Sequence, residues 1–405
     1  MKIIVKKFGG TSVSSVPKLK KIADNLSKEI DLKKNILVVL SAMGKSTDKL
    51  VDMSNKISKS PNPRDYDMLL STGEQISVSL LSMILNSRNV PAISLTGWQA
   101  GIYTDTTQMS SRIEKIDTKK IKSEFKKNRI VIVAGFQGID KNGNITTLGR
   151  GGSDTTAVAL AAALKANECQ IHTDVDGVYT TDPRICNKAR KLDKLTYEEM
   201  LEMSGLGSKV LQLRSVEFAS KYNVPLRVLH AHTKGVGTLI KKEEKKMEGA
   251  LISGIAFTKD EAEVMIKGVK DTPGVAAKIL GPIGDANIEV DMIVQNVGSN
   301  GLADFTFTVS RNTLRKAIQV IEKNKNIMMF DSVTSQKNIV KVSIVGVGMR
   351  SHAGIAGRMF KCLAKNKVNI RMISTSEIKI SVVIEQKSLE IAVQALHNEF
   401  KLDKK

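Results

Sequence analysis

A glycine-rich segment near the middle of the chain carries residue types that bind anions. It reads GRGGSDTT over residues 149–156 and runs directly into AVALAAAL, a strong helix-forming sequence. The glycines allow positive φ angles and a close approach of the backbone to a ligand. We expect Ser153 and Asp154 to be N-cap residues, and Arg150 adds a planar cation suited to a carboxylate or phosphate. A plain turn before a helix is the alternative, but the combination favours an anion held at a helix N-terminus.

A second candidate for binding phosphate is the segment KFGGTS at residues 7–12. An apolar strand over residues 3–5 precedes it, and we expect a helix from Pro17 to Ile30 after it. The lysine stands before the glycines, so this is not the Walker pattern, in which the lysine follows them. A lysine before two glycines is a weak signal by itself.

Two further segments place polar residues at the start of a helix. The run SAMGKST, residues 41–47, follows an apolar strand and carries small hydroxyl side chains. Residues 61–66 read as a loop, after which LLSTGE at 69–74 is expected to open a helix from Gln75 to Asn86. A solvated acid that favours the helix dipole is the alternative to a binding role for Glu74.

Strands and helices are expected to alternate along the first 240 residues and to position these side chains. Residues 194–213 read as helical segments broken at 205–207. His172 is expected to pack within its strand rather than act in catalysis. Apolar strands are expected at residues 35–40, 90–95, 129–134, 170–175 and 225–229. Repeated strand–loop–helix units predict an α/β fold with a doubly wound, mostly parallel sheet. Such sheets bind ligands at the carboxyl ends of their strands, where these loops fall.

After a charged run at residues 241–246, the best candidate for a linker, the pattern changes and repeats itself. Gly274 and Gly354 lie 80 positions apart, as do Ile293 and Ile373. Each copy reads as strand, glycine turn, helix, strand, β-rich stretch and closing helix, which predicts two small α+β domains. Neither copy contains a nucleophile–base pair or metal-ligand spacing, so both are interpreted as binding modules.

Composition limits the classes of function. The chain has 62 basic and 41 acidic residues, a net charge of +21, but its lysines are spread throughout and aromatic residues are only 4%, so we do not expect nucleic-acid binding. We expect no apolar run to approach the roughly 18 residues that span a membrane. The N-terminus lacks signal-peptide features, and three scattered cysteines suit a reducing cytoplasm. The five histidines show no ligand spacing with those cysteines, so no metal cage is expected.

Taken in order, the motifs resemble those of the aspartate kinase family over essentially the whole chain. They are KFGGTS at 7–12, SAMG at 41–44, GRGGSDTT at 149–156, TDVDGVY at 173–179 and TDPR at 181–184. The C-terminal repeat resembles the paired ACT domains of the same enzymes, including MISTSEI at 372–378. The resemblance implies an amino-acid-kinase domain at 1–245, one ACT domain at 264–337, and a second at 251–263 plus 338–405, with residues 251–257 supplying a strand to the last domain.

The resemblance implies a reaction in which the side-chain carboxylate of L-aspartate attacks the γ-phosphate of Mg-ATP. The products are 4-phospho-L-aspartate and ADP, the first step towards lysine, threonine, methionine and diaminopimelate. A carboxylate is already ionised at neutral pH, so no general base is required. The protein then has to position the reactants and neutralise charge on the phosphoryl group. No Mg²⁺ ligand is assigned, because the metal can be held by phosphates and water.

The resemblance also implies roles for individual residues. Lys7 would stabilise the transferring phosphoryl group, and Asp154 would orient the cationic groups around it. Nucleotide contacts are expected from Lys7, Gly9, Gly10, Ser41, Thr173, Asp174, Tyr179, Arg184, Lys209 and Val210. For aspartate, Arg150, Gly151 and Ser153 would hold the α-carboxylate, Glu74 the α-amino group, and Thr47 would line the pocket.

In this family lysine or threonine binds between ACT units and inhibits. By resemblance, the effector candidates are Asp271, Asp291, Gln295, Asn369 and Thr375, and an ammonium effector would favour the two acids. The chain departs from the common pattern at His352-Ala353-Gly354 and Arg371, and Gly281-Pro282 is expected to interrupt the first ACT helix. These departures concern the effector rather than the kinase chemistry.

A homo-oligomer, at least a dimer through ACT pairing, is expected. Some members of the family make a second, shorter subunit from an internal start, and Met247 stands where such a start would fall. An ordinary linker methionine is the alternative.

Two other classes of function remain open from the sequence. One is a kinase of the same fold acting on glutamate, acetylglutamate or a nucleoside monophosphate, against which the ACT pair argues. The other is an amino-acid sensor with a degenerate kinase domain, against which the presence of Lys7, Glu74, Arg150 and Asp154 argues.

Overall fold

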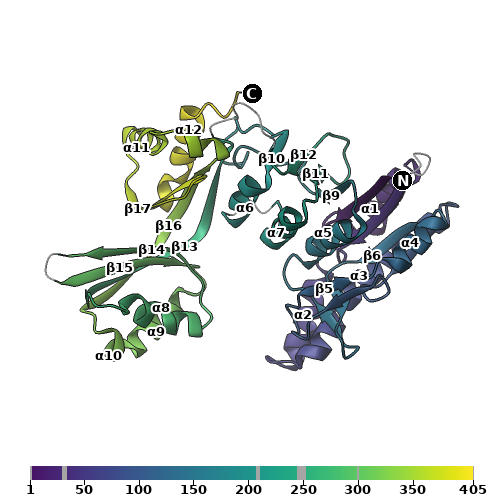
Figure 1. Ribbon diagram of the computed structural model, residues 1–405, viewed down its shortest axis with the longest axis horizontal. Coiled ribbons are helices and arrows are strands. Elements are labelled where there is room, and N and C mark those ends of the chain that lie inside the picture. The colour runs from purple at the N-terminus through teal and green to yellow at the C-terminus, as the bar shows by residue number, and fades with distance from the viewer. Residues whose placement is uncertain (1, 30–33, 207–209, 244–251, 299–300, 405) are drawn as a thin grey trace. The chain divides into compact units, whose positions relative to one another are not determined.

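The structure is a computed structural model of the 405-residue chain, and it describes all residues except 1, 30–33, 207–209, 244–251, 299–300 and 405 (Figure 1). The chain forms two compact units. The first contains Met1–Val178, Lys191–Gly205 and Lys209–Lys245, and the second contains Tyr179–Arg190, Leu206–Ser208 and Lys246–Lys405.

The first unit is built on an eight-stranded sheet of order β10-β12-β11-β9-β1-β2-β6-β3. Its strands are β1 (Lys2–Phe8), β2 (Lys34–Leu40), β3 (Ala92–Leu95), β6 (Ile130–Ala134), β9 (Glu168–Thr173), β10 (Lys194–Thr196), β11 (Leu226–His230) and β12 (Thr238–Lys241). Neighbours pair in parallel except β11 and β12, which are antiparallel. The predicted doubly wound, mostly parallel sheet is confirmed.

The central strands are buried on both faces, as their apolar sequences require. The helices of this unit are α1 (Val16–Ser27), α2 (Ser46–Ile57), α3 (Pro63–Asn86), α4 (Lys119–Lys126), α5 (Gly152–Leu164), α6 (Tyr197–Gly205) and α7 (Leu213–Tyr222). One face of the sheet packs with α1 and α3 around Phe8, Val38, Ile132 and Leu81. Nearly every residue of α5 is buried, consistent with its Ala/Leu sequence.

A second, four-stranded sheet in this unit was not predicted. Its order is β5-β4-β7-β8, with β4 (Ile102–Thr104), β5 (Ile113–Ile116), β7 (Gln137–Ile139) and β8 (Ile145–Thr147). Three or four residues are too few for an alternating pattern to stand out in a sequence. Strand β8 leads directly into the glycine-rich segment, so this sheet helps to position it.

The prediction of a loop at residues 61–66 and a helix starting at Gln75 is wrong. Helix α3 begins at Pro63, and the Asn62 side chain caps it by accepting a hydrogen bond from the backbone N–H of Arg64 at 3.0 Å. Proline is favoured in the first turn because its missing N–H would have no partner there. Glu74 consequently lies in the middle of a 24-residue helix and is buried, so the solvated alternative for this residue is also wrong.

Helix α3 is long and apolar enough to cross a membrane by length and composition, so the expectation that no segment approaches that length is corrected. Serine, threonine and glycine stand between its leucines, so the segment does not look like one continuous apolar run in the sequence. Half of its most apolar window is buried inside the protein, and Val78, Leu81 and Leu85 belong to the sheet-packing core. It is a core helix.

Residues 194–213 also differ from the prediction. Lys194–Thr196 form strand β10, and the helix α6 occupies Tyr197–Gly205. Residues 207–209 lie outside the described part of the chain, and α7 then begins at Leu213. Strand β10 forms because it pairs with β12, more than 40 positions later in the sequence. Local propensity does not reveal such a long-range contact.

The second unit contains a six-stranded antiparallel sheet of order β14-β15-β13-β16-β18-β17. Its strands are β13 (Gly254–Lys270), β14 (Val290–Val297), β15 (Leu302–Val309), β16 (Ser332–Val345), β17 (Ile370–Thr375) and β18 (Lys379–Glu385). Its helices are α8 (Val275–Asp285), α9 (Leu314–Lys323), α10 (Lys325–Met328), α11 (Ile355–Lys365) and α12 (Leu389–Glu399), with short 3₁₀ turns η2 (Val347–Ser351) and η3 (Gln386–Ser388). Figure 1 shows α8, α9 and α10 together on one side of β14 and β15.

The internal repeat is confirmed by these elements. Gly274 and Gly354 are the N-cap residues of α8 and α11, with φ angles of 91° and 87°, which only glycine adopts readily. The predicted interruption of the first ACT helix is wrong, because α8 continues through Pro282. The helix ends three residues later, so the proline removes a hydrogen bond only near its C-terminus.

The long strand β13 connects the two repeats. Its residues Gly254–Thr258 pair with Lys341–Val345 of β16, and Val264–Lys267 pair with Ser332–Ser335. Each repeat has its own core. One contains residues such as Ile255, Val342, Met359 and Val393, and the other residues such as Ile266, Ile279, Phe307 and Ile321. A third, smaller cluster of Met292, Ile339, Met372 and Val383 contains residues of both repeats.

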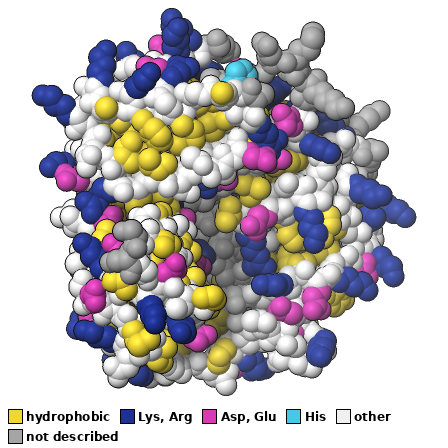
Figure 2. Space-filling view, turned by 60° about the vertical axis from the view of Figure 1, so that its left-hand side comes forward, with side chains coloured by type: hydrophobic (Ala, Val, Ile, Leu, Met, Phe, Trp, Pro, Cys, Tyr) yellow, Lys and Arg dark blue, Asp and Glu magenta, His cyan; other side chains and the backbone are white. Residues whose placement is uncertain are grey.

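The basic character of the chain is distributed rather than concentrated on the face shown in Figure 2. Lys and Arg side chains are scattered there, with Asp and Glu between them. This face has no continuous basic stripe of the kind that follows a nucleic-acid backbone.

Candidate active site

The loop after β1 forms a glycine cradle against the loop after β2. The N–H of Gly9 donates to the carbonyl of His172 at 3.2 Å, and the N–H of Gly44 donates to the carbonyl of Gly10 at 2.9 Å. A Cβ at Gly10 would lie 2.9 Å from the carbonyl oxygen of Ala42, so no larger residue fits. Gly44 itself has a φ angle of 55°. Two strand ends therefore place backbone close to the position that a phosphate would take.

Lys7 and Asp154 form an ion pair beside this cradle. The Nζ atom of Lys7, at the end of β1, lies 2.6 Å from Oδ1 of Asp154 in the first turn of α5. Both side chains are about nine-tenths buried, at 11% and 10% exposure. The structure thus brings together the two residues predicted to be catalytic. A cation held by a buried carboxylate can neutralise developing charge without first reorganising solvent.

The glycine-rich segment has two residues in the left-handed region, Gly149 with φ 73° and Gly151 with φ 74°. Gly151 is the N-cap of α5, so the prediction that Ser153 and Asp154 cap this helix is wrong. Both lie in its first turn instead. A Cβ at Gly151 would come within 2.3 Å of the Gln212 side chain, which explains why the cap is glycine. Arg150 is exposed in the loop, and Ser153 lies against Gly135 at the end of β6.

Glu74 contributes a buried carboxyl from the middle of α3. It is 3% exposed, and its Oε1 atom accepts a hydrogen bond from the backbone N–H of Ala42 at 3.1 Å. Its Oε2 atom is buried without a hydrogen-bond partner in the described structure. Burial raises the pKa of Glu74 to about 8, although the Ala42 N–H and the charge of Lys7 act in the opposite direction. A buried carboxyl with an unused oxygen suits a cationic ligand group.

The other predicted ligand residues in the first unit lie at strand and helix ends. Ser41 follows β2, its carbonyl accepts from the Ser77 hydroxyl at 2.8 Å, and Thr47 is half-buried in the first turn of α2. Thr173 ends β9 and its hydroxyl donates to the exposed Asp174 at 3.0 Å. These positions are at the carboxyl ends of neighbouring parallel strands, where such sheets bind ligands.

Three predicted nucleotide residues are not placed at this site by the structure. Tyr179 and Arg184 are grouped with the second unit, and Arg184 pairs with Asp182 at 2.7 Å. Lys209 lies outside the described residues, whereas Val210 is half-buried just before α7. His172 stacks on Phe8 with ring centroids 4.5 Å apart, in agreement with its predicted packing role.

Comparisons with known proteins agree with this architecture. Residues 2–230 match the amino acid kinase family, and residues 264–326 and 342–400 each match the ACT domain. An aspartate kinase of Pseudomonas fluorescens is 60% identical over 406 residues, covering 100% of this chain and 98% of that protein.

The chain belongs to the aspartate kinase family. It is an ATP-dependent phosphotransferase whose acceptor is the side-chain carboxyl group of aspartate.

Solved structures of aspartate kinases show the same fold. The enzyme from Synechocystis is 41% identical, with a TM-score of 0.57 over 98% of this chain and 69% of that chain. E. coli aspartokinase III in complex with lysine and aspartate is 25% identical, with a TM-score of 0.80 over 99% of this chain and 100% of that chain.

The effector residues predicted for this aspartate kinase lie on or beside strands β13, β14 and β17 of the second unit. Gln295 on β14 donates to Asp271, just after β13, at 3.4 Å. Asp291 on β14 is already ion-paired with the buried Lys341. Asn369 and Thr375 are exposed at opposite ends of β17. Of the two acids, Asp271 is therefore better suited to an incoming ammonium group.

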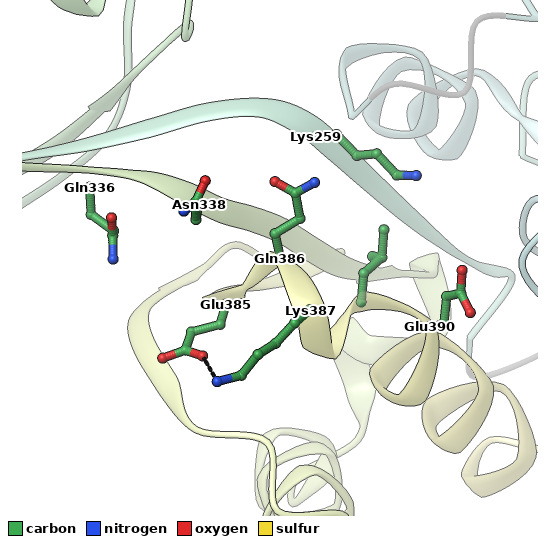
Figure 3. A pocket seen from close by; sticks show the side chains of 8 residues that line it. Lys259, Gln336, Asn338, Glu385, Gln386, Lys387 and Glu390 are labelled. Carbon is green, nitrogen blue, oxygen red and sulfur yellow. Dashed lines mark ion pairs between the residues drawn. The ribbon is translucent and has the colours of Figure 1, made fainter.

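An open groove in the second unit, with a volume of about 770 Å³, does not resemble a binding site for a charged ligand. It is lined by Lys259, Gln336, Asn338, Glu385, Gln386, Lys387, Leu389 and Glu390 (Figure 3). Its Lys387 and Glu385 pair with each other at 2.7 Å, and Lys387 is 82% exposed. Water screens such surface charges strongly.

Among the described residues, no group of three or more His, Cys, Asp or Glu side chains is arranged to hold a metal ion. Asp67 and Arg214, which contact Thr147 and Leu148 directly before the glycine-rich segment, were not identified from the sequence. No motif in the sequence includes Asp67 or Arg214, so only their tertiary contacts single them out.

Proposed function

We propose that Lys7, held by Asp154, is the cation that stabilises the γ-phosphoryl group during transfer from ATP to aspartate. The observation that best supports this is their 2.6 Å ion pair beside the glycine cradle formed by the loops after β1 and β2. The aspartate side-chain oxygen attacks the γ-phosphorus, the bond to the β–γ bridging oxygen breaks, and ADP leaves with that electron pair. No proton has to move, because the attacking carboxylate is already ionised.

Aspartate is oriented by its two other charged groups. Arg150, Gly151 and Ser153 bind the α-carboxylate at the N-terminal end of α5, where free N–H groups favour an anion. Glu74 binds the α-ammonium group, and Thr47 lines the pocket. The unpartnered, buried Oε2 atom of Glu74 supports this assignment, since an ammonium group would supply the missing partner.

ATP is bound across the ends of β1, β2 and β9. Within the first unit, the proposed nucleotide contacts are Gly9, Gly10, Ser41, Thr173 and Asp174. By resemblance, the proposed contacts also include Tyr179, Arg184, Lys209 and Val210. Mg²⁺ accompanies ATP and offsets phosphate charge, held chiefly by phosphate oxygens and water. The enzyme is cytoplasmic.

Regulation is assigned to the two ACT repeats, which we place at residues 264–337 and at 251–263 plus 338–405. Their separate cores and the pairing of Gly254–Thr258 with β16 support this division. Lysine, threonine or both inhibit the enzyme through Asp271, Asp291, Gln295, Asn369 and Thr375. E. coli aspartokinase III has been crystallised with lysine and aspartate, which supports an amino-acid effector.

In cells the enzyme assembles through its ACT repeats, as a homo-oligomer or with a short ACT-only subunit. Met247, where such a subunit would start, lies outside the described residues. A denaturing gel of the product of the unmodified gene tests the second arrangement, and a single band would exclude it.

The first experiment measures ADP formation from Mg-ATP with L-aspartate and with L-glutamate, each repeated with lysine, threonine and both. We expect turnover with aspartate alone, suppressed by at least one effector. Turnover that is indifferent to lysine and threonine would reject the proposed regulation while leaving the chemistry intact.

A variant tests the aspartate site. Arg150→Ala should raise the KM for aspartate by roughly tenfold or more, the loss expected when a charge-assisted hydrogen bond is removed. Arg129→Ala is the control, because Arg129 is a similarly exposed arginine that pairs with Glu124. An unchanged KM in Arg150→Ala would remove this residue from the substrate site.

A further inference from the structure

Asp67 is buried beside the glycine-rich segment without belonging to the proposed chemistry. It is fully buried in the second turn of α3, and both of its carboxylate oxygens accept hydrogen bonds. The Thr147 hydroxyl donates to Oδ1 at 2.6 Å and the Thr147 N–H donates to Oδ2 at 3.0 Å. The N–H of Met109 donates to the same carboxylate at 2.9 Å. The last residue of β8 is thus fixed to α3 at two points.

Arg214 binds Leu148, the residue that follows Thr147. From α7, its Nη1 atom donates to the carbonyl of Leu148 at 2.6 Å, and its Nη2 atom donates to the carbonyl of Ser111 at 2.9 Å. Ser111 in turn donates its N–H to the carbonyl of Thr147 at 2.9 Å. Three separate segments therefore converge on Thr147 and Leu148, directly before Gly149.

The loop that follows needs such external support. Gly149 and Gly151, both at positive φ, flank Arg150, so the backbone on either side of this arginine has little conformational restriction of its own. Met109 packs beside the loop, with its carbonyl oxygen 3.3 Å from the place of a Cβ at Gly149. Met109 also has a φ angle of 67°, an uncommon conformation for a residue with a side chain, and its N–H is one of those that Asp67 binds.

We propose that Asp67 and Arg214 form a clamp that positions the Gly149–Gly152 loop, and with it Arg150, for aspartate. This rests on the proposed role of Arg150 in binding the α-carboxylate. Neither residue of the clamp contacts substrate. Helix α5 is held independently, because it is buried in the core and the Thr156 hydroxyl accepts from the N–H of Phe136 at 3.0 Å. Loss of the clamp should therefore raise the KM for aspartate more than the KM for ATP.

Asp67→Asn tests the clamp, because an amide has one acceptor oxygen where the carboxylate receives donors on both. Asp140→Asn is the matched control. Asp140 is also buried, and it accepts from the N–H groups of Asn142 and Asn144 at 2.9 and 2.8 Å in the turn before β8, away from the glycine loop. Both variants should lose comparable thermal stability.

We expect Asp67→Asn to raise the KM for aspartate about tenfold, the effect of losing one hydrogen bond to a charged group, and the KM for ATP less than about twofold. Asp140→Asn should leave both constants unchanged. Hydrogen exchange of peptides covering residues 147–152 should accelerate in Asp67→Asn and not in Asp140→Asn.

Thr147→Val and Arg214→Met are milder variants that keep the test decisive if Asp67→Asn fails to fold. Each removes part of the clamp, and Arg214→Lys should restore part of the loss at that position. The proposal is overturned if the aspartate KM changes no more than in Asp140→Asn, or if exchange of residues 147–152 is unaltered. An unchanged aspartate KM in Arg150→Ala would instead reject the role of Arg150, and loop exchange alone would then decide whether the clamp exists.

Discussion

At the scale of single residues, the burial of Glu74 changes its protonation and thereby the binding of aspartate. Its carboxyl has a pKa of about 8 because burial disfavours the charged form. At neutral pH the free enzyme therefore holds this carboxyl mostly protonated. An α-ammonium group that binds there favours the ionised form, so the proton must leave when aspartate binds.

We predict that aspartate binding at pH 7 releases close to one proton, and that the affinity for aspartate rises as pH approaches 8. Calorimetric titration in buffers of different ionisation enthalpy measures the proton count. Glu74→Gln should abolish the release while weakening binding. Binding heats that do not depend on the buffer would contradict the assignment of Glu74 to the ammonium group.

The same pKa predicts the stability of the free enzyme. Between the ordinary carboxyl pKa of 4.5 and about 8, the unfolded chain ionises at Glu74 whereas the folded chain keeps its proton. The contribution of this group to the free energy of unfolding therefore falls as pH rises through that window. Glu74→Gln should lose less stability than the wild type over this window, as measured by denaturant unfolding at pH 5 and pH 8.

Lys7 is predicted to act in the transition state. Lys7→Ala should lower kcat by about 10²–10³-fold, roughly 3–4 kcal/mol, as expected for removing a preorganised charge. Lys6→Ala is the control, since Lys6 is the preceding residue of β1 and is also buried in an ion pair, with Glu29 at 2.6 Å. Circular dichroism should show both variants folded. A near-normal kcat in Lys7→Ala would overturn its role.

At the scale of elements, one helix supports several parts of the site. Helix α3 carries Asp67 against β8, Glu74 at the proposed aspartate site, and Leu81 in the core. Because a helix is rigid over the roughly four turns from Asp67 to Leu81, the positions of Glu74 and of the β8 end are coupled. The second element is the turn before α5, where two glycines at positive φ present Arg150.

Gly151→Ala should disturb this turn specifically. The substitution combines a positive φ angle with a Cβ that would lie 2.3 Å from the Gln212 side chain. Gly143→Ala is matched, because Gly143 also has a positive φ, 81°, but a Cβ there would meet nothing within 4 Å. Each should cost about 1 kcal/mol of stability from backbone strain, and steady-state kinetics should show a raised KM for aspartate only in Gly151→Ala.

At the scale of the whole molecule, catalysis and regulation are separated into two units with their own cores. Strands β13 and β16 make the two ACT repeats one continuous sheet, so an effector bound to one repeat has a direct structural path to the other. Inhibition through this unit would be a coupling free energy between effector and substrate sites.

Asp271→Asn should weaken inhibition without weakening catalysis. We expect the half-inhibitory concentration of the active effector to rise about tenfold, as for a lost ammonium–carboxylate contact, with kcat in the absence of effector unchanged. Asp285→Asn, an exposed acid at the end of α8, is the control. Equal inhibition of both variants would exclude Asp271 from the effector site.

Features that depend on local pattern could be predicted from the order of the amino acids. Apolar strands between helices predicted the parallel sheet, and an 80-residue offset predicted two similar domains with glycines at Gly274 and Gly354. The ordered motifs also predicted which residues would lie together, and the structure pairs Lys7 with Asp154, 147 positions later in the sequence.

Features that arise from contacts distant in sequence could not be predicted and are seen only in the folded chain. The burial of Glu74 depends on α3 starting at Pro63 and packing on the sheet, and its raised pKa follows from that burial. The contacts of Asp67 and Arg214 with Thr147 and Leu148 join segments 66 or more positions apart. No local pattern encodes such contacts, because their free energy appears only when the folded chain excludes water from them.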